Sequence, residues 1–141
     1  MNLYSHGELQ RYSQLLQIKQ SLVHVVDASV CIYDAEDADR VIEGITGAVT
    51  ESCIRIYICQ EDGYQISSNF FRGPLGWERS EQYRGSNWIW RPYFISNLLI
   101  MDMHKQGILS QVYTDLETSR SIQTFSCVLA EGYYVFLDLQ S

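Results

Sequence analysis

The stretch IRIYICQEDGYQISSNF, residues 54–70, decides the fold class of this chain of 141 residues. Apolar side chains alternate with other residues over 54–58, and this period of two predicts a half-buried strand. Glu61-Asp62-Gly63 is a typical hairpin turn, and the alternation that resumes over 64–70 predicts an antiparallel returning strand. A tight hairpin at this point favours an antiparallel sheet over a doubly wound nucleotide-binding fold.

More strands are expected towards the C-terminus. Residues 108–114 form a candidate strand, and residues 122–129 and 133–139 form a closing hairpin around Glu131-Gly132. The glycines and the proline of residues 73–76 are expected to interrupt regular structure. Together with the first hairpin, these segments predict an α+β domain with a central, mainly antiparallel sheet of five or six strands.

Helices are expected to flank this sheet. A long N-terminal helix is predicted over about 8–26, a second helix over 38–49 with Asp37 as its N-cap, and a short helix over Pro92–His104. The first helix carries two apolar stripes, which leaves two alternatives open. Both stripes are buried in one core, or one of them faces a partner chain and predicts a homodimer.

Composition limits the class of protein. The length and an apolar content of 46 % are typical of one globular domain, 1–141, with its core over about 37–139. The net charge of −7 disfavours binding to nucleic acid or to an anionic membrane surface. No apolar run reaches the length of a membrane-spanning helix, and the N-terminus has no signal-peptide pattern, so a cytoplasmic protein is expected.

The four cysteines do not form a recognisable metal site. Cys31, Cys53, Cys59 and Cys127 include no pair with CxxC spacing, and the three histidines are scattered. A structural zinc site is therefore not expected, and the cysteines are interpreted as reduced, mostly buried thiols. No bound cofactor is predicted.

One segment is dense in aromatic residues and arginine. Residues 84–94 contain two tryptophans, a tyrosine and two arginines, a composition that suits a pocket for a small molecule. An arginine fork matches a carboxylate or a phosphate. The alternative is purely structural: Trp88 and Trp90 close the open end of the sheet, and Arg91 pairs with an acidic side chain. No GxGxxG, GxxxxGK[ST] or GxSxG motif is present, which disfavours an enzyme.

Several strings resemble a known family. YIC-x-x-DG-x-Q-x-SSN over 57–69 is similar to the paired strands that open a Cache-type sensor core, and NW-x-WRPYF over 87–94 is similar to the segment that shapes its pocket. Residues 107–118 and 121–139 resemble the following strand and the closing hairpin. Over roughly 8–139 the chain most resembles the EAL-associated signalling domain, a PAS/Cache-like sensor family found C-terminal to EAL domains, which hydrolyse cyclic di-GMP.

The resemblance implies a regulatory part without the catalytic domain, because the chain has no Glu-Ala-Leu signature and no recognisable set of acidic metal ligands. In ligand-binding Cache domains an arginine and aromatic residues often hold a carboxylate, while an aspartate holds an amine. Carried over to this sequence, the ligand-binding residues are Trp88, Trp90, Arg91, Tyr93, Tyr113 and Asp115. The fuller amino-acid-binding pattern of those domains is not convincingly present.

Two arrangements of this set remain open. In the first, Arg91 and Asp115 face a small zwitterion or carboxylate; in the second, they form a direct salt bridge in a closed core. The expected function is a sensory and dimerisation module, regulating an EAL phosphodiesterase domain in the same full-length protein. The alternatives are a purely structural dimerisation domain and a small enzyme with a site around Arg91 and Asp115.

Overall fold

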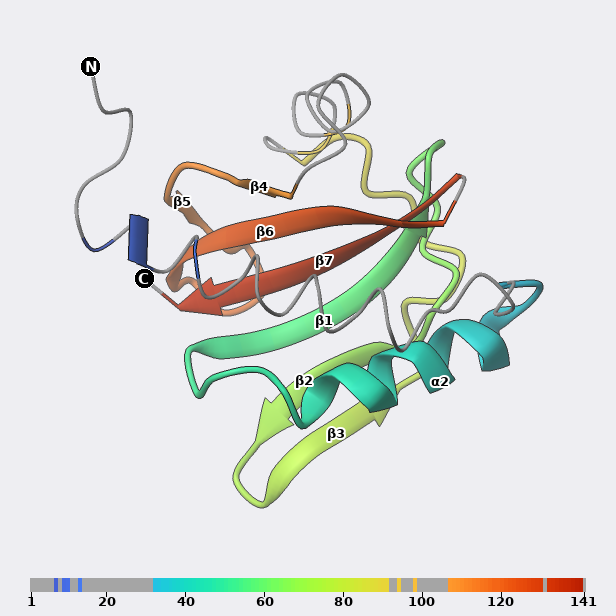
Figure 1. Cartoon of the computed structure of the whole chain (residues 1–141), viewed down its shortest axis with the longest axis horizontal. Helices are drawn as coiled ribbons and strands as arrows, with labels where there is room; N and C mark the ends of the chain where they lie inside the picture. Colours follow the sequence, from blue (N-terminus) through green and yellow to red (C-terminus); the bar gives the residue numbers. More distant parts are fainter. Residues whose placement is uncertain are drawn as a thin grey trace.

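The computed structural model of the chain describes residues 32–91, 107–130 and 132–140 (Figure 1). Outside these ranges it describes only isolated positions: Gly7, Leu9, Gln10, Ser13, Phe94 and Leu98. The expected helices over 8–26 and Pro92–His104 therefore lie outside the described residues, apart from those positions.

A seven-stranded sheet forms the centre of the fold. Its order is β3-β2-β1-β7-β6-β4, with β5 also paired to β6, and every pairing is antiparallel. This confirms the predicted α+β class and antiparallel sheet. The strands are β1 (Cys53–Gln60), β2 (Asn69–Gly73), β3 (Gly76–Ser80), β4 (Ile108–Leu109), β5 (Tyr113–Thr114), β6 (Ser121–Ala130) and β7 (Tyr133–Gln140).

The sheet has two buried faces of different character. On the first face, Ile56 and Ile58 of β1 join a cluster of aliphatic side chains with β6, β7 and the helix α2 (Ala35–Thr46). On the second face, Tyr57 packs in a mainly aromatic cluster that includes Phe136. Successive side chains of a strand point to opposite faces, so β1 contributes to both clusters.

The N-cap of α2 differs from the prediction. Asp34 caps the helix, because its backbone is extended and its carboxylate accepts a hydrogen bond from the backbone N–H of Asp37 at 2.9 Å. The carboxylate of Asp37 reaches back to the backbone N–H of Tyr33 at 3.0 Å. Asp37 therefore lies in the first turn, and the helix begins and ends about three residues before its predicted bounds.

The strand predicted over 64–70 is also wrong in its extent. The hydroxyl of Ser67 accepts the backbone N–H of Ile58, and the backbone of Gln65 bonds to Ser86 and Gly85. These contacts turn residues 64–68 towards the loop that follows β3, so the returning strand β2 begins only at Asn69.

Residues 73–76 join two strands, although they were predicted to interrupt regular structure. Gly73 pairs with Gly76 across a two-residue turn, which makes a hairpin of β2 and β3. Gly76 has a φ of +126°, a conformation that favours glycine. The strand predicted over 108–114 is divided into β4 and β5, which pair with β6 on either side of residues 110–112. At Ser110 the side-chain hydroxyl accepts the hydrogen bond from the backbone N–H of Thr124.

Candidate functional site

A buried network of charges lies on the second face of the sheet. The guanidinium of Arg55 donates to both carboxylate oxygens of Asp115, at 3.3 and 2.9 Å, and to Asp138 at 2.8 Å. The exposed fractions of these side chains are 6 % for Arg55, 2 % for Asp115 and 0 % for Asp138. Glu117, one-third exposed, forms a further ion pair with Arg55 at 3.1 Å.

Strand register places this network. Arg55 of β1 lies opposite Asp138 of β7, which lies opposite Thr124 of β6, so three polar side chains form a row across three strands. The hydroxyl of Thr124 donates to Asp138 at 2.8 Å and is hydrogen-bonded to the hydroxyl of Tyr113 at 2.5 Å. A shift of register between Cys53 and Arg55 marks an irregularity of β1 immediately before this row.

The environment changes the acidity of both aspartates. Burial alone would raise the pKa of Asp115, but hydrogen bonds from Arg55 and Thr118 outweigh it and lower this pKa to about 2. Burial raises the pKa of Asp138 above its ordinary value, although the charges of Arg55 and Arg91 oppose this change. The pKa values of the two carboxyl groups in this network are therefore shifted in opposite directions.

Acid is expected to weaken the fold through Asp115. Its pKa is lower in the folded chain than its ordinary 3.8, so its stabilising contribution is present above that value and is lost as the pH falls towards 2. We expect this contribution to be about 2 kcal/mol. Urea unfolding between about pH 5 and pH 2 should therefore show a smaller loss of stability in Asp115→Asn than in the original chain. Equal losses would contradict the assignment.

Arg91 occupies a separate position on the same face. Its guanidinium lies over the ring of Trp88, 4.4 Å from the ring centre, and donates to the hydroxyl of Tyr57 at 3.3 Å. It also forms an ion pair with Asp138 at 3.8 Å. The indole N–H of Trp88 in turn donates to the side chain of Gln65 at 2.7 Å. These contacts fix the planar guanidinium at the edge of the charge network.

Four of the six predicted ligand-binding residues border one small cavity of about 190 Å³. They are Trp90, Arg91, Tyr113 and Asp115, and Thr114 and Leu116 complete its described lining. Trp88 is not in the lining but stacks against Arg91 and packs beside Trp90. Tyr93 lies outside the described residues.

The alternative of a direct salt bridge between Arg91 and Asp115 is wrong for the described residues. Asp115 is paired with Arg55, while Arg91 is paired with Asp138. Sequence reasoning missed Arg55 and Asp138, although a signal was present. Each is a charged residue inside an otherwise apolar strand, at CIRIYIC and YVFLDL, and a charge at such a position requires a buried partner.

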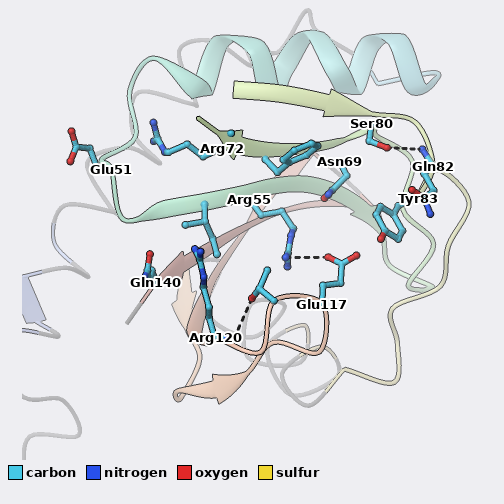
Figure 2. Close-up of a pocket in the computed structure, with 14 residues that line it drawn as sticks. Glu51, Arg55, Asn69, Arg72, Ser80, Gln82, Tyr83, Glu117, Arg120 and Gln140 are labelled. Carbon is cyan, nitrogen blue, oxygen red and sulfur yellow. Dashed lines mark hydrogen bonds and ion pairs between the residues drawn. The ribbon is translucent and has the colours of Figure 1, made fainter. Parts of the chain in front are cut away.

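Arg55 also borders a larger cavity, of about 580 Å³ (Figure 2). Arg55 and Glu117 both line it, and Figure 2 shows their side chains pointing towards one another. Asp115 borders the small cavity and Glu117 borders the large one, so the guanidinium of Arg55 lies between the two.

Comparison with known proteins identifies the family. Residues 3–141 match the sequence model of the EAL-domain associated signalling protein domain. The chain belongs to this family. The EAL-associated domain is distinct from the catalytic EAL domain, so this chain corresponds to the signalling part, as the sequence predicted.

Relatives of the EAL-associated domain support the same assignment. The EAL-domain containing protein YkuI of Bacillus subtilis is 35 % identical over 117 residues, which are 83 % of this chain and 29 % of YkuI. The crystal structure of YkuI with cyclic di-GMP and calcium superposes with a TM-score of 0.79 at 31 % identity, covering 93 % of this chain and 32 % of that one. The chain thus spans about a third of the length of these relatives.

More distant structures share the fold of this EAL-associated domain. The ligand-binding domain of the Campylobacter jejuni chemoreceptor Tlp3, in complex with L-valine, has a TM-score of 0.58 at 12 % identity. It covers 91 % of this chain and 52 % of the Tlp3 chain. This likeness shows that the chain shares the fold of that domain. Among the described residues, no helix is both long and apolar enough to cross a membrane.

Proposed function

We propose that this chain is a sensory module that binds a small molecule in the small cavity. The proposal is carried by the meeting of Trp90, Arg91, Tyr113 and Asp115 around that cavity. These residues come from two segments more than twenty residues apart, and both a cation and an anion border the space. A few fixed polar groups beside aromatic rings are typical of a ligand pocket.

The charges favour a ligand with no net charge. Among the buried side chains of the network, Arg55 and Arg91 balance Asp115 and Asp138, while Glu117, the remaining acidic member, is one-third exposed to water. A net charge added beside this set would be unpaired in a site of low polarity, which is unfavourable. A zwitterion adds one group of each sign and keeps the balance.

Each charged end of a small zwitterion has a candidate partner. Arg91 offers its guanidinium to a carboxylate. At Asp115, oxygen Oδ2 already accepts from Arg55 and twice from Thr118, whereas Oδ1 accepts, among the described residues, only from Arg55 at 3.3 Å. A carboxylate oxygen has about two acceptor positions, so Oδ1 retains one for a ligand ammonium. L-Valine, the ligand of the Tlp3 structure, is a suitable first probe of this class.

The module is proposed to act on an EAL domain in the same protein. YkuI contains an EAL domain, and its crystal structure holds cyclic di-GMP as substrate. We propose that ligand binding biases hydrolysis of cyclic di-GMP and that the module acts as a homodimer in the cytoplasm. Cys53 and Cys59 are buried thiols outside any disulfide among the described residues, which fits a reducing compartment.

Loss of Arg91 is expected to abolish the response to ligand. A set of small zwitterions, beginning with L-valine, is screened by thermal unfolding and calorimetry. A binder present at a hundred times its dissociation constant should raise the free energy of unfolding by about 2.7 kcal/mol. In Arg91→Met this increase should disappear while the chain remains folded.

Arg40→Met is the matched control, because the side chain of Arg40 is 71 % exposed on α2 and far from the network in sequence. It should respond like the original chain. If no zwitterion stabilises the chain, the structural dimerisation domain is the better account. If Arg91→Met still responds fully, the ligand binds elsewhere.

A further inference from the structure

The large cavity has its own chemistry, distinct from that of the small one. Its polar side chains come from β1 and the turn before it, from β2, from the end of β3 and the loop after it, from the loop after β5 and from the end of β7 (Figure 2). Three arginines and two glutamates line it, an excess of one positive charge in a chain of net charge −7. The described lining comprises Glu51, Ile54, Arg55, Asn69, Phe71, Arg72, Gly73, Ser80, Gln82, Tyr83, Glu117, Thr118, Arg120 and Gln140.

The three arginines differ in how many partners their guanidinium groups already have within the chain. Arg55 is bound to Asp115, Asp138 and Glu117. Arg72 donates to the backbone carbonyls of Thr50 and Cys53 and lies over the ring of Trp77. Arg120 forms no ion pair with any residue in the part of the chain that the structure describes. The positive charge available to a ligand is therefore that of Arg120.

Glu117 already occupies an anion position in this cavity. Its carboxylate lies 3.1 Å from Arg55, and its proximity to Tyr83 raises the pKa of that phenol above its ordinary value. Asp115 and Asp138 are almost completely buried, whereas the side chain of Glu117 is 33 % exposed. Water therefore competes with Glu117 for Arg55 more than with the two aspartates, and Glu117 contributes least to holding Arg55 in place.

We propose that the large cavity binds a small oxyanion, carried on a carboxylate or phosphate group. The oxyanion takes the place of Glu117 at Arg55 and Tyr83 and is held on its other side by Arg120. A cation has no comparable place, because Glu117 is already paired with Arg55 and the lining holds more arginines than glutamates. The neutral amides of Asn69, Gln82 and Gln140 offer further donors to such a group.

This site goes beyond the proposed function, since it is a second cavity with a different charge preference. Its volume of about 580 Å³ lies within the range of small-molecule sites, and an oxyanion on an organic molecule fits better than a bare ion. Arg55 and Arg120 supply planar forks that suit oxygens of either a carboxylate or a phosphate.

Two substitutions are expected to change binding in opposite directions. The chain is titrated with inorganic phosphate and with succinate at constant ionic strength, with sodium chloride as the reference, and binding is followed by calorimetry. Arg120→Gln should weaken binding and raise the dissociation constant by about tenfold. Glu117→Gln should strengthen binding and lower the dissociation constant by about tenfold, because the carboxylate of Glu117 no longer competes for Arg55 or repels the oxyanion.

Arg79→Gln is the control, because Arg79 is a half-exposed arginine of β3 that does not line the cavity. It should bind like the original chain, and circular dichroism should show that all three variants are folded. Binding of phosphate alone assigns a phosphate ligand, and binding of succinate alone assigns a carboxylate ligand. No saturable binding beyond sodium chloride, or the same dissociation constant in Arg120→Gln and Glu117→Gln, would overturn the proposal.

Discussion

Replacing Arg55 by methionine is expected to cost the folded chain about 3–5 kcal/mol. The substitution keeps most of the side-chain length but removes the charge that pairs with Asp115 and Asp138. Two buried carboxylates then lose their main partner, and Asp138 has no exposed surface through which water can compensate. Urea unfolding at neutral pH measures the loss directly through the midpoint of the transition.

Arg79→Met provides the comparison for this large effect. Arg79 is 45 % exposed, and its ion pairs with Asp39 and Glu43 are both at 3.7 Å. Because both pairs are long and the guanidinium of Arg79 is open to water, they are expected to contribute up to about 1 kcal/mol. If Arg55→Met loses no more stability than Arg79→Met, the network around Arg55 does not hold the sheet as described.

Replacing Asp39 by alanine is expected to cost about 3 kcal/mol. Asp39 of α2 is 1 % exposed and accepts three hydrogen bonds of 2.7 Å, from the backbone N–H and the hydroxyl of Ser68 and from Arg84. Its carboxylate thereby ties the helix to the segment before β2 and to the loop after β3. Removing it leaves several buried donors without an acceptor.

Glu43→Ala is the matched change on the same helix. The side chain of Glu43 is 56 % exposed, and its ion pair with Arg79 is long, so a change within about 0.5 kcal/mol is expected. Thermal or urea unfolding of the two variants side by side separates the anchoring role of Asp39 from a general effect of charge on α2. Similar losses in both variants would contradict that role.

Much of the fold was predictable because it depends on local patterns. The period-two alternation of β1, β6 and β7 and the turns beside them predicted the central strands. The prediction of element boundaries failed where two local backbone arrangements are both compatible with the sequence. Asp34 and Asp37 are both good N-cap residues, and only the backbone conformation at Asp34 selects between them. The late start of β2, at Asn69, depends on the hydroxyl of Ser67, which accepts a hydrogen bond from the backbone N–H of Ile58.

The candidate site was predictable in part. Tyr113 and Asp115 are two residues apart, and Trp90 and Arg91 lie in an unusual aromatic segment, so composition pointed to them. Arg55 and its partners were not found together, because they are 60 and 83 residues apart in the chain. Only the register of β1 on β7 and the position of the loop after β5 bring them into contact.

The existence of two cavities could not be predicted from the sequence. Arg55 pairs with both Asp115 and Asp138, and Arg91 pairs with Asp138 alone among the described carboxylates; Asp115 borders the small cavity and Arg55 the large one. A sequence pattern assigns residue types to a site but does not decide which arginine pairs with which carboxylate. That choice determines which charges remain available to a ligand.

The central claim is that a small zwitterion binds beside Arg91, and the three tryptophans of the chain allow a direct measurement. Trp90 lines the small cavity and Trp88 stacks on Arg91, whereas Trp77 packs with the aliphatic cluster on the other face of the sheet. In a nitrogen–proton NMR titration with the best-binding zwitterion, the indole signals of Trp88 and Trp90 should shift in a saturable manner and that of Trp77 should not. The shifts should be lost in Arg91→Met. Unchanged signals of Trp88 and Trp90 at saturation, or equal shifts of all three tryptophans, would contradict the account.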